Sequence, residues 1–423
     1  MEIEVSPIEV ISGHAAKDAL RVADAALTRV NRNAGRNTYL SVNESWTRDQ
    51  AARLSEGERT QPLYGLPIAL KDCFDLEGFV TSCGSRFYAH RNAPASSDSW
   101  VAERLKMAGA VITGKTHMQM LAYGITGENR DYGDCVQPID PASLTGGSSS
   151  GSAAAVQEDS AVAAIGTDTG GSIRAPAALC GLAGYRASLG VGNWRGAAHL
   201  AESFDTIGWL CRDLRDLFRL AHALFGFSVP AAASSGSRVS VISGSMLDDC
   251  ETAVLSSLTI WKERITKAGA RLGEFQPDFF TEAFSIYAPL QAVEAARWHT
   301  GFFDEFEPEI ADRLRWGARL TAEELAHWRA KHQSFIANIS ALFTQADFLL
   351  MPAVPLRRLA AGEDQTVARP RILRYTTPAS LAGLPAVVLP GSPGLQLLAA
   401  RGDDARLLQF AAQLGLLLAA EEA

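Results

Sequence analysis

Residues 142–188 read ASLTGGSSSGSAAAVQEDSAVAAIGTDTGGSIRAPAALCGLAGYRAS, and the rest of the chain is organised around this stretch. Two clusters rich in glycine and hydroxyl residues, 146–152 and 166–172, are separated by an apolar segment with a short polar patch. Glycine permits turns in which several backbone N–H groups converge on an anion. A serine beside such amides is what acyl transfer requires, because the amides stabilise the oxyanion that forms when the serine attacks a carbonyl carbon.

Residue chemistry alone leaves two other interpretations of these clusters open. A flexible linker would be polar throughout, whereas the apolar segments 153–156 and 161–165 lie between the clusters. A phosphate-binding loop would carry G-K-[ST] or the spacing G-x-G-x-x-G, and neither cluster contains either pattern. The residues therefore favour a nucleophilic serine without deciding which serine it is.

The composition is that of an enzyme with a large core. Of the 423 residues, 47% are hydrophobic and 20% are charged, and the net charge of −8 argues against a nucleic-acid partner. Six cysteines lack any C-x-x-C spacing, and no signal peptide is recognised, so we expect reduced thiols in a cytoplasmic protein. We expect no membrane span, because no apolar run is long enough, and no metal site, because the histidines lack ligand spacing.

Hydrophobic periodicity predicts alternating helices and strands, which is typical of an α/β layered fold. Short apolar runs predict strands, and one of them, 161–165, leads through the second cluster into a helix near 175–182. Residues 218–345 are predicted to be helical, with amphipathic segments at 251–269, 281–298 and 321–342. Further helices are predicted over 15–30, 44–54 and 97–110, and further strands over 68–70 and 110–116.

Lys71 ends the apolar run Ile68-Ala69-Leu70. Most lysines in such a position reach the surface with their charge in water. A buried lysine instead has a pKa that falls from about 10.4 towards neutrality, and it can then act as a general base. The local sequence leaves both interpretations open.

The chain resembles the amidase signature family of serine hydrolases. The family segments GGSSxGSAAAV and GTDTGGSIRxPAAxCGxxGxR/KP are matched within 146–186, the second over nearly its whole length. The resemblance extends to GLPIALKD at 65–72, ESFDTIGWLCRD at 202–213 and the C-terminal TTPASLAGLPAVVLP, and it weakens between about 218 and 345. It implies a single α/β domain over 1–423 with a mixed central sheet covered on both faces by helices. The implied parts are a catalytic core at about 60–215, a helical substrate-pocket region at about 218–345 and a C-terminal return at about 346–423.

The resemblance also implies a Ser–cis-Ser–Lys triad, in which Ser172 is the nucleophile, Ser148 the bridging serine and Lys71 the base. No metal or cofactor is implied. Asp168, four residues before Ser172, is expected to hold the loop instead of acting as a base. The implied oxyanion hole consists of the backbone amides of Thr169, Gly170, Gly171 and Ser172. The further candidates for substrate contact are Gly147, Ser149 and Arg174. Two of them have a structural alternative: Ser149 could bond to the backbone of its own turn, and Arg174 could belong to a structural ion pair.

The implied activity is hydrolysis of a small-molecule carboxamide to a carboxylate and ammonia. Ser150 stands where many members have glycine, and this variant resembles indole-3-acetamide hydrolases, so arylacetamides are the first substrates suggested. Two alternatives remain: an amidotransferase component that supplies ammonia to a tRNA-linked partner, and a catalytically silent receptor with the same fold. We expect a small-molecule amide as the ligand, no nucleic-acid or membrane partner, and an assembly that allows a homodimer.

Overall fold

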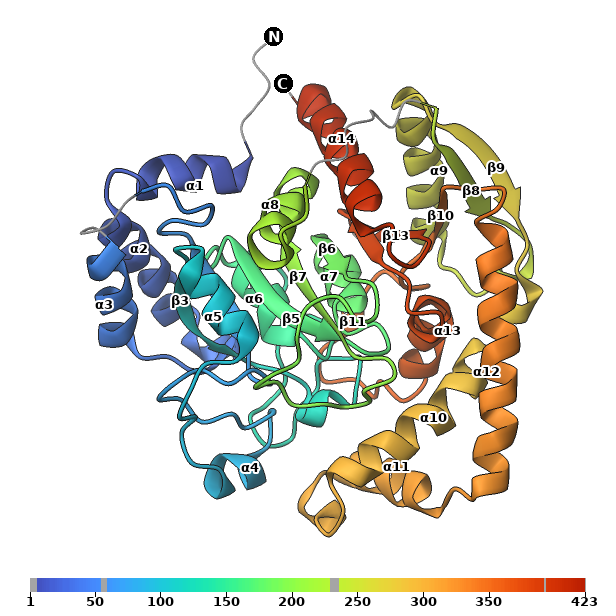
Figure 1. The fold of residues 1–423 in the computed structure, drawn as a ribbon, viewed down its shortest axis with the longest axis horizontal. Helices are drawn as coiled ribbons and strands as arrows, with labels where there is room; N and C mark the ends of the chain where they lie inside the picture. The colour runs from blue at the N-terminus through green and yellow to red at the C-terminus, as the bar shows by residue number, and fades with distance from the viewer. Residues whose placement is uncertain (1–5, 55–58, 229–235, 392, 423) are drawn as a thin grey trace.

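The computed structural model describes residues 6–54, 59–228, 236–391 and 393–422, which fold around one large mixed sheet (Figure 1). Over these residues the sheet has eleven strands. In spatial order they are β1 (Tyr39–Ser41), β3 (Val111–Thr116), β2 (Pro67–Lys71), β5 (Ala163–Asp168), β7 (Thr206–Cys211), β6 (Ala183–Arg186), β12 (Ala386–Leu389), β13 (Leu395–Ala399), β10 (Phe348–Pro352), β8 (Arg238–Ile242) and β9 (Arg271–Phe275).

Parallel and antiparallel pairs occupy different parts of the sheet. Strands β3, β2 and β5 are parallel neighbours, as are β10, β8 and β9. The strands between these two groups pair antiparallel. A separate two-stranded ladder joins β4 (Ser143–Leu144) to β11 (Leu359–Ala360). The mixed sheet confirms the predicted fold class.

Helices cover both faces of the sheet, and alternation along the strands explains why both faces are apolar. On β5, Ile165 belongs to the same apolar cluster as residues of α8 and α14, whereas Ala164 belongs to the cluster that contains residues of α6 and α7. The helices are α1 (Pro7–Ala15), α2 (Ala19–Arg32), α3 (Glu44–Leu54), α4 (Arg86–Arg91), α5 (Trp100–Met107), α6 (Ser150–Gln157), α7 (Arg174–Cys180), α8 (Leu214–Phe225), α9 (Thr252–Lys267), α10 (Ala283–Trp298), α11 (Pro308–Arg319), α12 (Ala322–Leu342), α13 (Ala368–Leu381) and α14 (Asp404–Glu422).

Part of the prediction for residues 218–345 was wrong. Helices α9, α10 and α12 lie where periodicity placed them, but the segment also contains β8 and β9. Strand β9 lies at the edge of the sheet, and four of its five residues are exposed. An exposed edge strand needs no alternation of apolar residues, which is why pattern reading missed it.

Helices α10, α11 and α12 form an arm beside the C-terminal part of the sheet (Figure 1). Helix α10 packs against α11, α12 and α13, so this arm meets the core through α13. None of the helices in the described ranges is long and apolar enough to cross a membrane.

Candidate active site

Lys71 is the last residue of β2 and is fully buried. Because β2 and β5 run parallel, with Leu70 opposite Ile165, the end of β2 lies beside Thr167 on β5. Lys71 Nζ is 2.9 Å from Ser148 Oγ and 2.8 Å from Thr167 Oγ1. The amine is therefore fixed between two hydroxyls, one from each glycine-rich cluster.

A second buried lysine, Lys115, shows what distinguishes Lys71. Lys115 Nζ forms an ion pair with Asp72 Oδ1 at 2.8 Å, and both side chains are almost inaccessible. Within the described part of the chain no carboxylate forms an ion pair with Lys71, and burial lowers the pKa of its amine. An amine without a counter-ion in a low-dielectric site loses its proton more readily, and the neutral form can accept one.

The two serine segments are joined through their backbones. Ser148 follows a cis Gly147–Ser148 peptide bond, and the Ser149 amide donates to the Ser172 carbonyl at 3.1 Å. Ser172 lies between the end of β5 and the start of α7, is 3% exposed and lines a small pocket. The fold thus brings Lys71, Ser148 and the loop carrying Ser172 together.

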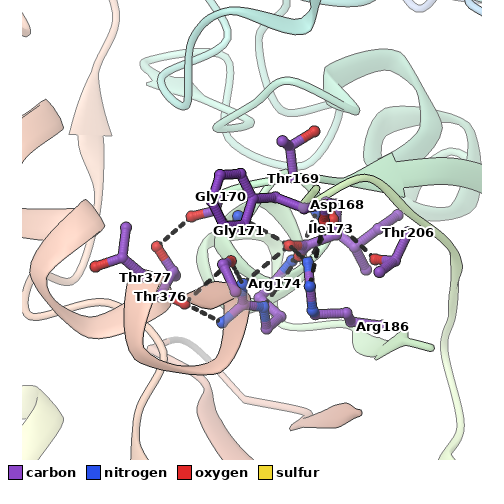
Figure 2. A network of polar contacts seen from close by, with 12 residues as sticks. Asp168, Thr169, Gly170, Gly171, Ile173, Arg174, Arg186, Thr206, Thr376 and Thr377 are labelled. Atoms are coloured by element: carbon purple, nitrogen blue, oxygen red, sulfur yellow. Dashed lines mark hydrogen bonds and ion pairs between the residues drawn. The ribbon is translucent and has the colours of Figure 1, made fainter. Parts of the chain in front are cut away.

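Asp168 organises the loop that carries Ser172 (Figure 2). Its carboxylate accepts the amides of Gly171, Ile173 and Arg174 and forms ion pairs with the guanidinium groups of Arg174 and Arg186. Burial opposes ionisation, but the two arginine charges outweigh it and hold the pKa of Asp168 well below its usual range. The expectation that Asp168 holds the loop is confirmed.

The same network bears on the predicted roles of Gly171 and Arg174. The Gly171 amide, expected in the oxyanion hole, donates to Asp168 Oδ1 at 2.9 Å and is committed to the loop. Arg174 was a candidate for either substrate contact or a structural ion pair. It is fully buried and its five N–H donors all have protein acceptors, which favours the structural alternative. These acceptors are both Asp168 carboxylate oxygens, the Thr376 carbonyl, Gln396 Oε1 and Ser380 Oγ.

The other two predicted substrate contacts also have internal partners. The buried Ser149 hydroxyl donates to the Thr167 carbonyl at 3.3 Å, and the Gly147 amide donates to the Ile125 carbonyl at 2.9 Å. Neither residue lines the pocket beside Ser172. Both residues neighbour Ser148 in sequence, but the turn directs these groups into the protein.

Helix α10 contributes a hydroxyl to the pocket. Tyr287 is 1% exposed, its hydroxyl has no hydrogen-bond partner among the described residues, and it lines the pocket together with Gly170 and Ser172. A methyl group on Gly170 would come within 2.6 Å of Tyr287 Oη, so glycine is needed at 170 for this close approach. The pocket lining consists of Ala122, Tyr123, Gly124, Ile125, Gly170, Ser172, Leu200, Tyr287, Gln291, Arg369 and Leu373.

Sequence reasoning missed the contribution of Thr167, to which it assigned no role. The available signal was position: Thr167 lies one residue before Asp168, directly after the apolar run 161–165. Only the structure shows that this strand pairs with β2. The sequence offers Tyr287 as one of several aromatic residues in the helical region that could line an acyl pocket, but periodicity cannot tell a pocket hydroxyl from a packing ring.

Comparisons with known proteins identify the family of the chain. A family model described as Amidase matches residues 21–408. The chain is 30% identical over 409 residues to 2-amino-5-chloromuconic acid deaminase of Comamonas testosteroni, covering 89% of this chain and 87% of that protein. It is 31% identical over 432 residues to a glutamyl-tRNA(Gln) amidotransferase component of Coxiella burnetii strain RSA 493, covering 88% of each. A crystal structure of an amidase superposes with a TM-score of 0.87 at 30% identity, covering 98% of this chain and 99% of that one.

Proposed function

Because the chain belongs to the amidase signature family and is an enzyme of that hydrolase class, we propose that it hydrolyses a small-molecule carboxamide to a carboxylate and ammonia through Ser172, Ser148 and Lys71. The observation that carries this proposal is the environment of Lys71. A fully buried amine bonded only to hydroxyls, one of them on Ser148, is suited to taking a proton from a serine.

The proposed reaction has two stages. Neutral Lys71 takes the Ser148 proton while Ser148 takes the Ser172 proton, and Ser172 Oγ bonds to the amide carbon. The proton then returns through Ser148 to the amide nitrogen, the C–N bond breaks and ammonia leaves an acyl-serine. Water attacks that ester by the same proton route and releases the carboxylate and free Ser172.

The oxyanion of each tetrahedral intermediate would be held by backbone amides of the loop after β5. With the Gly171 amide committed to Asp168, the proposed donors are the amides of Thr169, Gly170 and Ser172. Loss of one such donor typically costs about 10²–10³ in kcat. Arylacetamides such as indole-3-acetamide remain a prediction for the acyl group.

Labelling with a fluorophosphonate, read by intact mass, tests the proposed nucleophile. The wild type is expected to gain one adduct, Ser172→Ala none, and Lys71→Ala an adduct at a rate slower by about 10³-fold or more. Ser150→Ala is the matched control, because the buried Ser150 hydroxyl has no hydrogen-bond partner among the described residues and no assigned role. Labelling of folded Ser172→Ala at the wild-type rate would refute the assignment of the nucleophile.

A second candidate function is supported by the similarity to the glutamyl-tRNA(Gln) amidotransferase component. In that role the same residues would free ammonia from glutamine for use by a partner. Rapid ammonia release from small amides by the isolated chain favours the amidase. Release from glutamine alone, and only after a partner protein is added, favours the amidotransferase role.

A further inference from the structure

Arg369, near the start of α13, lines the pocket beside Ser172 and has no partner for its charge among the described residues. Among the residues that the structure describes, none forms a hydrogen bond or an ion pair with the Arg369 guanidinium, and its Nε atom is buried without an acceptor. The guanidinium instead lies over the Phe284 ring, 5.9 Å from the ring centroid. An arginine that lies beside a pocket and has unpaired N–H donors can bind an acceptor group of a ligand.

Arg313 of α11 lies close to Arg369. It donates to the Tyr123 carbonyl at 2.8 Å and its guanidinium stacks over the Tyr123 ring, but its Nε is also buried without an acceptor in the described part of the chain. Burial, and then the charge of Arg313, lowers the pKa of Arg369 to about 10. Two cations from helices far apart in sequence therefore converge beside Tyr123, another lining residue of the pocket.

The surrounding acidic groups do not neutralise this pair. The charges of two glutamates act on Arg313: Glu309 lies on the same helix, and Glu307 lies just before that helix. Glu309, however, forms an ion pair with Arg130 at 3.1 Å. Glu307 accepts a hydrogen bond from the Arg130 backbone. The other titratable groups acting on the two arginines, Tyr123 and Tyr287, have pKa values raised by burial and are neutral near pH 7.

We propose that Arg369, assisted by Arg313, binds a carboxylate on the acyl part of the substrate. The planar guanidinium forks match a carboxylate, and its negative charge would offset the repulsion between the two cations. Since ammonia is the leaving group in the proposed reaction, on which this inference rests, the carboxylate belongs to the acyl part. The substrate class is thus the monoamide of a dicarboxylic acid, and this proposal replaces the neutral arylacetamides that the sequence suggested.

Paired substrates that differ by one group test this specificity. Malonamate, succinamate and glutaramate are compared by ammonia release with propionamide, butyramide and valeramide, in which a methyl replaces the carboxylate. For the best pair the wild type is expected to favour the anion in kcat/KM by about 10²-fold or more. Arg369→Gln is expected to reduce that ratio to about 10-fold or less, mainly because kcat/KM for the anionic amide falls.

Arg371→Gln is the matched control on the same helix, because Arg371 is already bound to the Asp249 carboxylate at 2.9 Å. It should leave the wild-type ratio unchanged. A wild type that hydrolyses both members of every pair equally, or an Arg369→Gln variant with the wild-type ratio, overturns the proposal.

A binding measurement separates this proposal from the catalytic one. Malonate, succinate and glutarate are added to the wild type and to Arg369→Gln, and the shift in Tm is recorded beside fluorophosphonate labelling. A dicarboxylate that raises the Tm of the wild type but not of the variant supports the carboxylate site even if Ser172 is unreactive. Labelling of Ser172 without any such shift, and with no preference for anionic amides, overturns the carboxylate site and leaves the amidase intact.

Discussion

Thr167 gives Lys71 a second hydroxyl partner and thereby fixes the direction of the amine. With Nζ held 2.8 Å from Thr167 Oγ1, the amine stays directed at Ser148 instead of rotating away. Burial lowers the lysine pKa, whereas the oxygen that accepts from Nζ favours the charged form. Position and protonation of the proposed base thus depend on a residue outside the triad.

This balance predicts a specific pH dependence. Activity should rise with pH along an acid limb centred below the ordinary lysine pKa of about 10.4, as Lys71 loses its proton. Thr167→Val removes an acceptor that stabilises the charged amine, so the limb should move to lower pH while kcat/KM on the plateau falls about 10-fold. Profiles of kcat/KM against pH measure both effects.

Thr113→Val is the control for this substitution. Thr113 is equally buried, lies on the neighbouring strand β3 and bonds to Tyr39 Oη at 3.1 Å, so its loss should leave the limb in place. An unshifted limb in Thr167→Val would show that Thr167 does not act on Lys71.

At the scale of helices and strands, Arg174 connects several elements of the fold. It starts α7, binds Asp168 at the end of β5 and reaches the Thr376 carbonyl on α13 (Figure 2). It also donates to Gln396 on β13. The loop carrying Ser172 is therefore fixed to the C-terminal part of the chain. The sequence left Arg174 open between a structural ion pair and a substrate contact, and the fold shows the ion pair.

Arg174→Gln is expected to lower the free energy of unfolding by about 3–5 kcal/mol, because it leaves the buried Asp168 with one of its two cations. Arg371→Gln, which breaks a partly exposed pair on α13, should cost about 1 kcal/mol or less. Urea denaturation at pH 7 gives both values. Equal and small losses for the two variants would contradict the structural role of Arg174.

At the scale of the whole molecule, the C-terminal part of the chain completes the middle of the sheet. Strand β12 pairs with β6, and β13 joins β12 to β10, so segments far apart in the sequence are adjacent in the sheet. Helix α14 packs on α8, and both helices cover the same face of the sheet (Figure 1).

A chain that ends after Phe225 is therefore expected not to fold. It would retain the glycine-rich clusters and Lys71, but it would expose the β6 edge and the apolar face of α8. Thermal unfolding followed by circular dichroism should show a cooperative transition for the full chain and none for the shortened one. A cooperative transition in the shortened chain would show that its half of the sheet is stable alone.

The sequence by itself determined the features that are local or follow the family pattern. The glycine-rich clusters, the α/β class and most helices could be predicted. The conformational freedom of glycine and the period of the apolar residues both depend on residues close together in the sequence. The strand β9 could not, since an exposed edge strand lacks that pattern. The triad was predicted from resemblance, and its catalytic roles still await the labelling experiment.

Only the tertiary structure decided which polar side chains have their hydrogen-bond and charge partners within the protein and which can bind a ligand. Arg174 and Arg369 are the same residue type near the same loop, yet among the described residues the first has all its donors bound and the second has none bound. That difference depends on acceptors from distant segments, and sequence neighbours carry no information about them. The physical reason is that burial and pairing, which decide whether a charge is structural or available, are set by long-range contacts.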